Sequence, residues 1–428
     1  MTGFRRLSTV AGLGLALILG LIGPAQGATP IRLTDIYNPL KILKAELTLP
    51  QSSVDSLDST DVNQLKVYVP GTIVFTVDGK TSGTLDIKVR LKGSTSMYRL
   101  SETPSFKIKF QKDAVGNGYL GLNRMTFNGM VQDNSKVHEF GAYTLFNAVG
   151  VAAPKTGYVR LYINGVDRGL FANVEQPDQI FMQKRFKDIT QHIYEGVAFR
   201  DLKLGNATGD NLTGPFLVDY GWKVTPNKRD LEKLINYAND WEPKTWYADL
   251  PQVIDRTSLI KAFAVESFLS HWDGYSGPDI NNYFLRSNTK GKFTYIPWGA
   301  DQTFGENRKS EKLGDDFFVP LVSETATQPW SSNPNMYRGK LYVQCIQYKL
   351  CRTEYLNQLK LVSATATKIK LGDQMKAVAK VINPVLTVQF GKDAAALKLI
   401  KDEQARTVAY IAKRQATVAA TLKKYGIK

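Results

Sequence analysis

Acidic and amide residues stand on both sides of an expected β-hairpin. The stretch before the hairpin contains Asp273, Asn281 and Asn282, and the stretch after it contains Asp301. Two runs rich in β-forming residues predict the hairpin over 283–297. Because both loops meet at one end of the hairpin, we expect these side chains to lie together. Carboxylate and amide oxygens are the ligands that hard cations prefer, so the pattern indicates a divalent-cation site.

The order of these groups is that of the phosphoryl-transfer residues of protein kinases, in which the second acid precedes a Phe-Gly pair, here Phe304-Gly305. By this order Asp273 would accept the proton of a substrate hydroxyl, and Asp301 would hold Mg²⁺ with Asn281 or Asn282. Asn281 follows Asp273 by eight positions, a longer gap than in the usual kinase motif. A single aspartate in such a loop is more often only a cap or a turn former.

A strand predicted at 105–110 offers the complementary cations. Its alternation places apolar side chains on one face and Lys107 and Lys109 on the other. One of these lysines could contact phosphate oxygens, and Glu139, near the start of the next expected helix, could pair with it as in kinases. The alternation does not decide between the two lysines. An edge strand with both lysines in water would give the same pattern.

A short turn before that strand combines basic and hydroxyl residues. It contains Arg90, Ser94 and Ser96 around Gly93. Backbone amides and hydroxyls in such a turn can cover phosphates, so these residues are candidates for nucleotide binding. The turn matches neither a Walker loop nor the glycine-rich loop of typical kinases.

The pattern of elements predicts an α+β fold with a β-rich N-lobe and a mostly helical C-lobe. Short β-rich runs fill 65–175, with one helix over 136–149 that Ser135 would cap. Helices dominate 176–338. The expected helices of that region lie at 179–186, 229–239 and 256–271.

The two ends of the chain differ from this central part. Residues 1–27 read as an export signal, with a basic start, an apolar run and small residues at the end, and 28–64 as an extension. No later run is long enough to span a membrane. The formal net charge is +16, and 339–428 hold 17 Lys and Arg against 5 Asp and Glu on predicted helices. We therefore expect an exported chain, in the periplasm, at the cell surface or outside the cell.

Other chemistries have less support in the sequence. Cys345 and Cys351 are close enough in an exported chain to form a local disulfide. The three histidines are scattered, which disfavours zinc, and no Gly-x-Ser-x-Gly elbow is present. A pair of glycosidase carboxylates stays open as a weaker alternative, since any two acids could meet in a fold. No specific nucleic-acid partner is expected.

Over about 66–305 the chain resembles the CotH kinase-like family of secreted atypical kinases. The likeness rests on several motifs in order: Arg90-Leu-Lys-Gly-Ser-Thr-Ser, Pro104-Ser-Phe-Lys-Ile-Lys-Phe, Gly150-Val-Ala-Ala-Pro-Lys, Tyr158-Val-Arg-Leu-Tyr-Ile-Asn-Gly, Gly169-Leu-Phe-Ala-Asn-Val-Glu, Trp272-Asp-Gly-Tyr, Asn281-Asn-Tyr-Phe-Leu and Ile296-Pro-Trp-Gly-Ala-Asp-Gln-Thr-Phe-Gly. The basic C-terminal segment lies outside this resemblance.

The resemblance implies a kinase-like fold that binds ATP and Mg²⁺ or Mn²⁺ and phosphorylates Ser or Thr of exported proteins. It implies that Asp273 is the catalytic-loop aspartate, that Asp301 is the metal aspartate, and that Lys107 or Lys109 contacts phosphate. Glu175 belongs to a recurrent motif without an assigned physical role. Gly299 stands where the family commonly has a further acid, which puts a second metal and full activity in question.

A second hypothesis comes from a different class. On the same fold, the chain could be a non-catalytic envelope or surface protein that docks acidic partners through its basic C-terminal segment. Gly299 and the scarcity of ATP outside the cytoplasm favour this alternative. Salt-sensitive partner binding that survives loss of Asp301 would separate it from the kinase hypothesis.

Overall fold

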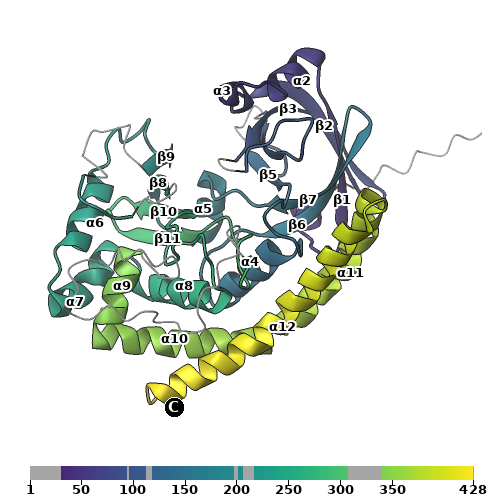
Figure 1. The fold of residues 1–428 in the computed structure, drawn as a ribbon. Coiled ribbons are helices and arrows are strands. Elements are labelled where there is room, and N and C mark those ends of the chain that lie inside the picture. Colours follow the sequence, from purple (N-terminus) through teal and green to yellow (C-terminus); the bar gives the residue numbers. More distant parts are fainter. Residues whose placement is uncertain are drawn as a thin grey trace, which may run out of the picture.

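The computed structural model describes residues 30–93, 96–111, 118–196, 201–205, 216–306 and 339–427 (Figure 1). It contains a β-barrel, a second sheet with its helices, and a group of long C-terminal helices. This arrangement confirms the predicted α+β class. The expected export signal and Ser94 lie outside the described residues.

Seven strands close into the barrel in the order β1-β2-β3-β4-β5-β7-β6. Their bounds are β1 Ile42–Thr48, β2 Val69–Val77, β3 Lys80–Lys92, β4 Ser105–Phe110, β5 Arg124–Asn128, β6 Thr156–Ile163 and β7 Val166–Val174. The parallel pairing of β1 with β6 closes the sheet. The inward face of β3, β4 and β5 is apolar and buried: Val89, Leu91, Phe106, Ile108, Met125 and Phe127.

The barrel includes a strand that we expected in an N-terminal extension. β1 lies within 28–64, and it pairs with β2 on one side and β6 on the other. Three short helices accompany it: α1 Leu33–Ile36, α2 Gln51–Leu57 and α3 Val62–Leu65. The barrel therefore starts near residue 42 and not at 65, because without β1 the edges of β2 and β6 would stay open.

The second sheet has the order β11-β10-β8-β9. Its strands are β8 Thr190–Gly196, β9 Phe216–Tyr220, β10 Tyr283–Asn288 and β11 Phe293–Pro297. The predicted hairpin is thus present as β10 and β11, which pair antiparallel. The helices of this region are α5 Gln179–Arg185, α6 Arg229–Asn239, α7 Pro243–Val253 and α8 Arg256–Leu269.

The helix predicted over 136–149 is α4, which spans His138–Ala148. It starts later than expected because Lys136 has a left-handed φ of 66°. The predicted N-cap, Ser135, is wrong: the N-cap residue is Val137, which has no side-chain cap, and Asp133 instead fixes the turn before the helix. Its carboxylate accepts the backbone N–H groups of Lys136 and His138, both at 2.8 Å.

The C-terminal segment forms α9 Lys340–Gln347, α10 Lys349–Lys368, α11 Leu371–Phe390 and α12 Ala394–Lys424. The expected disulfide between Cys345 and Cys351 joins α9 to α10. In Figure 1, α10 runs beneath α8, and α11 and α12 run on toward the barrel. The apolar stripe of α12 is buried in the same core as α4 and α8: Ile400, Ile411, Val418 and Leu422. These helices are therefore part of the folded body.

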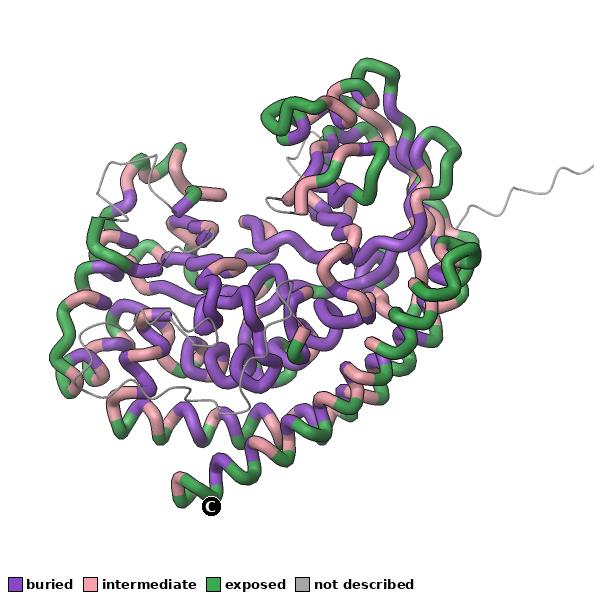
Figure 2. Tube along the Cα trace, in the orientation of Figure 1, coloured by how far each residue is buried: buried purple, intermediate pink, exposed green. Residues whose placement is uncertain are grey.

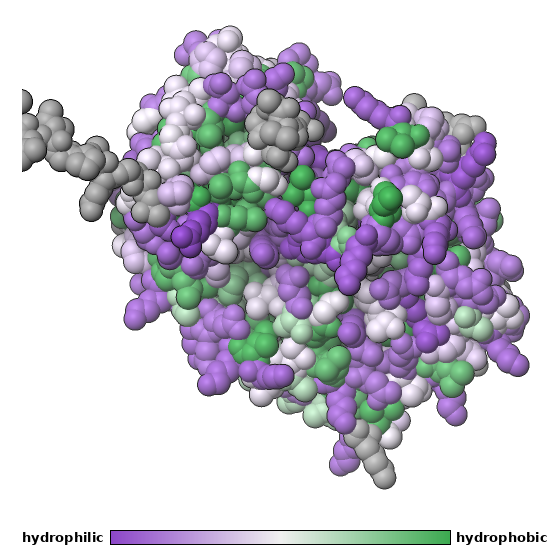
Figure 3. Space-filling model, turned by 180° about the vertical axis from the view of Figure 1, so that it is seen from behind, coloured by the Kyte–Doolittle hydropathy of each residue, from purple (hydrophilic) through white to green (hydrophobic). Residues whose placement is uncertain are grey.

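Burial separates the centre of the molecule from its rim. β10, β11 and α8 are almost wholly buried, whereas one side of the C-terminal helices is exposed (Figure 2). Seen from behind, hydrophilic residues cover most of the surface, and hydrophobic ones form small groups (Figure 3). Of the helices in the described residues, none has an apolar stretch long enough to cross a bilayer.

Candidate active site

The structure brings together the two loops that carry the predicted acids. The backbone N–H of Trp272 donates to the carbonyl of Gln302 at 3.1 Å, and that of Phe304 donates to Leu269 at 2.6 Å. The Gln302 side chain then reaches the Asp273 carboxylate, with Nε2 at 3.3 Å from Oδ2. The loops of Asp273 and Asp301 therefore lie side by side at one end of the β10–β11 hairpin.

Asn281 and Asn282 turn their amide groups toward Asp273. Their Nδ2 atoms donate to the Asp273 oxygens at 3.1 Å and 2.5 Å. With Gln302, three amides hold this carboxylate in one orientation. We call Asp273, Asn281, Asn282 and Asp301 the acidic edge.

Gly299 adopts a backbone shape that explains why no acid stands there in this chain. Its φ is +52°, a region that L side chains rarely adopt. A Cβ at this position would come within 2.5 Å of the Asn282 side chain. His271 is buried, and its Nε2 lies 3.2 Å from the Gly299 carbonyl. An acid at 299 would therefore require Asn282 to move.

Glu139, from the first turn of α4, lies close to Asp301. Burial raises the pKa of the Glu139 carboxyl, and the Asp301 charge raises it further. Burial likewise raises the pKa of Asp301. Asn128 on β5 orients Glu139, donating to its Oε2 at 2.8 Å. Two buried carboxyls with raised pKa values form a place where a cation would be stabilised.

The cation that acts on both carboxyls is Lys92, which we did not predict. The Lys92 charge opposes the upward shifts in the pKa values of Glu139 and Asp301. Its Nζ lies 5.6 Å from the centre of the Trp298 ring. Lys92 ends β3 within the turn that we had singled out for its basic residues. Apart from its place in that turn, the sequence gives no signal for Lys92, because Glu139 and Asp301 lie on distant elements of the chain.

Lys92 belongs to a group of basic side chains on the outer faces of β3, β4 and β5, which we call the cationic barrel face: Lys88, Arg90, Lys92, Lys107, Lys109 and Arg124. Lys107 is only 8% exposed and Lys109 is exposed, so the two predicted lysines differ. Burial lowers the pKa of Lys107, and the Glu195 charge on β8 opposes that shift. Lys107 thus faces the second sheet and not open water.

The predicted phosphate-covering turn is only partly described. Arg90 is half-buried, stacks over Tyr68 at 5.3 Å and donates to the carbonyl of Leu91 at 3.0 Å. Ser96 is also half-buried. The contacts of Arg90 leave it on the same barrel face as Lys92 and Lys107.

Glu266 on α8 organises the loop of Asp273, and sequence reasoning missed it. The carboxylate is fully buried and accepts the backbone N–H groups of Tyr275 at 3.3 Å and Ser276 at 2.8 Å. The hydroxyls of Ser276 and Tyr295 also donate to it. An apolar helix face gives no signal for such a contact, because the partners lie in a loop and in another strand.

α12 fastens the other side of the acidic edge. Arg406 donates from Nη1 to the Phe304 carbonyl at 2.9 Å, and the Tyr410 hydroxyl lies 2.6 Å from Ser270 Oγ. Arg414 is buried and donates to the Ser267 and Phe268 carbonyls at the end of α8. The helix therefore braces both loops of the acidic edge.

Asp133, His138 and Glu306 form a second cluster with possible metal-ligand atoms within 4.8 Å of one another. Most of their atoms have other partners. Asp133 accepts backbone N–H groups at the start of α4, and the two His138 ring nitrogens lie 2.9 Å from the Asp301 carbonyl and from Thr407 Oγ1. Glu306 accepts from Asn134 with Oε1, whereas its buried Oε2 has no hydrogen-bond partner among the described residues. The cluster thus ties α4 to the Asp301 loop and to α12.

Glu175 has a physical role at the junction between β7 and α5. The Arg185 guanidinium donates to both Glu175 carboxylate oxygens, at 3.2 Å and 2.5 Å. The backbone N–H of Lys155 also donates to Glu175, at 3.1 Å. The next residue, Gln176, accepts from Thr126 on the cationic barrel face at 3.0 Å. This junction fixes the barrel to the second sheet.

Comparison with known proteins gives a consistent family. A family model described as CotH kinase protein matches residues 89–418. The chain is 22% identical to the inner spore coat protein H of Bacillus subtilis (strain 168) over 54% of this chain and 63% of that protein. It is 23% identical to the invasin CotH2 of Rhizopus delemar over 58% of this chain and 44% of the relative. The match thus spans less than two thirds of either relative.

Among solved structures, the Helicobacter pylori proinflammatory kinase CtkA is similar at 9% identity and a TM-score of 0.30, over 76% of this chain and 96% of that one. The family match reaches well into α12. The expectation that the basic C-terminal segment lies outside the family was therefore wrong, in accord with its buried contacts to the acidic edge.

Proposed function

The chain belongs to the CotH kinase protein family, and on that premise we propose that it is an exported protein kinase. It would transfer the γ-phosphate of ATP to Ser or Thr hydroxyls of other exported proteins. One observation carries the proposal: Asp273, Asp301 and Glu139 gather at one end of the β10–β11 hairpin, and Lys92 of the barrel acts on the last two. A nucleotide triphosphate with its metal requires carboxylates that hold the metal and, facing them, cations that contact the phosphates.

The residues present fit a divalent cation. Burial raises the pKa values of Glu139 and Asp301, and the Asp301 charge raises that of Glu139 further; a bound cation would offset these effects. These carboxylates offer the oxygen ligands that suit Mg²⁺ or Mn²⁺. The Nδ2 atoms of Asn281 and Asn282 donate to Asp273. Their side-chain oxygens would therefore be the ligands for a metal. When bound, the ion would neutralise phosphate charge.

The side chains of this chain would do the rest by position and charge. Asp273, held by amides, would orient the acceptor hydroxyl and receive its proton. Lys92 and Lys107 would face the phosphates from the barrel. Burial lowers the pKa of Lys107 and so disfavours its charged form, and an anionic ligand would oppose that effect. Catalysis would be mostly positioning and charge stabilisation.

Export and location are part of the same proposal. The first 27 residues have the pattern of an export signal. The relatives are named as an inner spore coat protein and an invasin, and such names support a place at a surface. We therefore place the substrates of this chain among exported or surface proteins.

The direct test is phosphate transfer by the full chain. The protein is incubated with ATP and Mg²⁺ or Mn²⁺, alone and with casein, and phosphorylated Ser and Thr are located by mass spectrometry. We expect transfer by the wild type, and a loss of at least about 100-fold for Asp301→Asn and for Asp273→Asn, the range of a positioned catalytic group. Asp373→Asn, at an exposed site on α11, is the matched control and should leave activity unchanged. Wild-type protein without any transfer would overturn the proposal.

Gly299 favours one second candidate, a protein that binds nucleotide or acidic partners without transferring phosphate. Gly299 stands where the family commonly has an acid, and an acid here would require the Asn282 side chain to move. Deleting 392–428 does not test this alternative cleanly, because it would also remove Arg414 and the other α12 contacts to the acidic edge. Neutralising exposed lysines such as Lys398 and Lys401 is the better test.

A further inference from the structure

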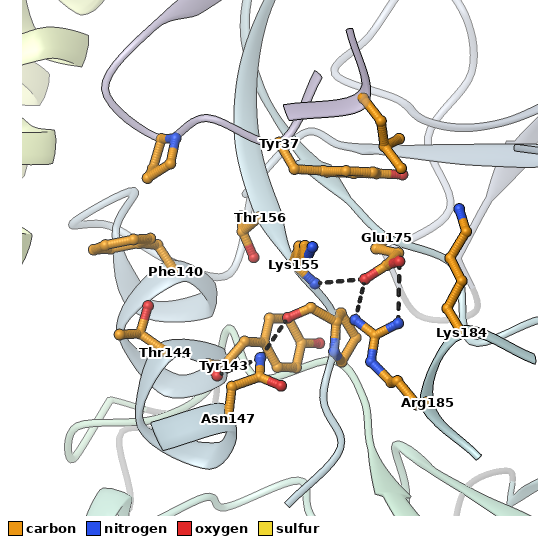
Figure 4. A pocket seen from close by; sticks show the side chains of 13 residues that line it. Tyr37, Phe140, Tyr143, Thr144, Asn147, Lys155, Thr156, Glu175, Lys184 and Arg185 are labelled. Carbon is orange, nitrogen blue, oxygen red and sulfur yellow. Dashed lines mark hydrogen bonds and ion pairs between the residues drawn. The ribbon is translucent and has the colours of Figure 1, made fainter. Parts of the chain in front are cut away.

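A cavity of about 540 Å³ lies behind the junction of β7 and α5, between α1, α4 and β6 (Figure 4). Its size is in the range of small-molecule sites. Neither the acidic edge nor the cationic barrel face contributes a side chain to its lining. Tyr143 separates the cavity from the acidic edge: it lines the cavity, and its hydroxyl donates to Glu139, which lies next to Asp301, at 3.4 Å.

The walls of the cavity are mainly flat and apolar. They include Leu33, Tyr37, Pro39, Phe140, Tyr143 and Pro154. Aromatic rings and prolines of this kind stack against flat ligands at little cost in entropy, because they are held by the fold. The cavity therefore suits a ligand with an aromatic body.

Two buried hydroxyls that line the cavity have no hydrogen-bond partner among the described residues: those of Tyr37 and Thr156. Tyr37 is 8% exposed and Thr156 is 6% exposed. Buried polar atoms are almost always bonded, so each hydroxyl marks a place for a ligand atom. Figure 4 shows them apart, with Thr156 toward α4 and the Tyr37 hydroxyl over Glu175. One ligand that met both would be elongated.

The charges around the cavity favour an acid at one end of that ligand. Lys155, Lys184 and Arg185 line it against the single acid Glu175. Glu175 is already bonded to Arg185 and to the backbone N–H of Lys155. Lys155 directly precedes Thr156, and the two lie next to each other in Figure 4. Two of these cations, Lys155 and Lys184, have no ion pair among the described residues. Lys155 stands near the Thr156 hydroxyl, whereas Lys184 stands beside Glu175, whose charge opposes its own.

We propose that this cavity binds an elongated aromatic acid. The carboxylate would accept from the Thr156 hydroxyl beside Lys155, the ring would lie between Phe140, Tyr143 and Tyr37, and a second polar group would bond the Tyr37 hydroxyl. This binding site is separate from phosphoryl transfer and does not depend on it.

The test uses 6-hydroxy-2-naphthoate, which has a carboxylate and a hydroxyl at opposite ends, and two probes that each lack one group, 2-naphthoate and 2-naphthol. Binding to the full chain is measured by titration calorimetry. We expect 6-hydroxy-2-naphthoate to bind best. Thr156→Val should weaken both acids about tenfold, as for a hydrogen bond to a charged group. Tyr37→Phe should weaken 6-hydroxy-2-naphthoate about fivefold, as for a neutral bond, and leave 2-naphthoate unchanged.

Thr144→Trp fills the cavity from α4 and should abolish binding of all three probes. If that variant does not fold, judged by its melting curve, Thr144→Ile takes its place with a partial loss. Tyr98→Phe and Thr387→Val, at exposed sites outside the cavity, are the matched controls. Equal binding of 2-naphthol and the acids, or no binding at millimolar concentration, would overturn the proposal. Binding that Thr144→Trp leaves intact would place the probe elsewhere and overturn it as well.

Discussion

The acidic edge and the cationic barrel face approach each other from differently built regions. The loop of Asp273 is held by the buried Glu266 carboxylate, and that of Asp301 by α12. The barrel face has fewer such contacts: Arg90 and Lys92 lie over aromatic rings, and Lys88 and Lys109 lie in water. Arg124 is the exception on the barrel face, since both its terminal nitrogens bond Asp219 on β9, at 3.0 Å and 2.9 Å.

This difference indicates that the acidic edge is preorganised and the cationic barrel face is not. Acids are kept close together only where buried contacts from several elements oppose their repulsion. The lysines repel one another less, because most of them reach solvent. We infer that the acidic edge keeps its geometry without ligand, whereas the barrel face depends on an anion for its full order.

The largest expected effect comes from loosening the acidic edge. Glu266→Gln replaces an acceptor of four donors with a group that can accept on one oxygen only, so it should lower the free energy of unfolding by about 3 kcal/mol. Urea unfolding measures this change. Glu46→Gln, on the exposed side of β1, should stay within about 0.5 kcal/mol. Equal losses of unfolding free energy in the two variants would show that the buried contacts of Glu266 do not stabilise the acidic edge.

The next effect concerns the barrel face. Lys92→Met should weaken binding of a non-hydrolysable ATP analogue with Mg²⁺ about tenfold or more, because Lys92 is the cation that acts on Asp301 and Glu139. Lys109→Met, which removes an exposed charge from the neighbouring strand, should change it less than about threefold. Calorimetry gives both values. A larger loss for Lys109 would reverse the assignment of the phosphate lysine.

Gly299 allows the packing of the acidic edge to be tested directly. Gly299→Asp combines a positive φ with a Cβ close to Asn282, and should cost about 2 kcal/mol of stability. Asn282→Ala combined with it should recover part of that loss, since one of the two causes is removed. Thermal unfolding of both single variants and the double variant forms the cycle. Strict additivity would mean that Asn282 is not the obstacle.

The smallest effect is a pH dependence of metal stabilisation. Burial holds the pKa values of Glu139 and Asp301 above those of an unfolded chain. The folded protein thus keeps protons that the unfolded chain has released, and its stability without metal falls as the pH rises through this window. Mg²⁺ would displace those protons, so the rise in melting temperature with Mg²⁺ should be larger at pH 8 than at pH 5.5. A rise that is equal or larger at pH 5.5 would contradict the site.

The sequence predicted the parts of this site that depend on local pattern. The hairpin, the positions of Asp273 and Asp301 at its end, and the apolar and cationic faces of β4 follow from alternation and loop placement. The local disulfide also follows from spacing. These features involve residues that are near one another in the chain.

The contacts missed by the sequence are between distant residues. The charge of Lys92, at the end of β3, lowers the pKa of Asp301, which follows β11. Arg406 on α12 donates to the carbonyl of Phe304. β1 closes the barrel with β6, although more than a hundred residues separate them. No periodicity records such pairings, because each element shows only that it has a buried face and not what covers that face.

In the proposed kinase, Asp301 holds the metal and Lys92 contacts the phosphates in one site. A crystal structure with a non-hydrolysable ATP analogue and Mn²⁺, with the anomalous signal of manganese recorded, tests this most directly. We predict a manganese peak at about 2.0–2.2 Å from an Asp301 oxygen, with phosphate oxygens beside Lys92. Manganese bound at Asp133, His138 and Glu306 instead, or a nucleotide remote from Lys92, would contradict the claim.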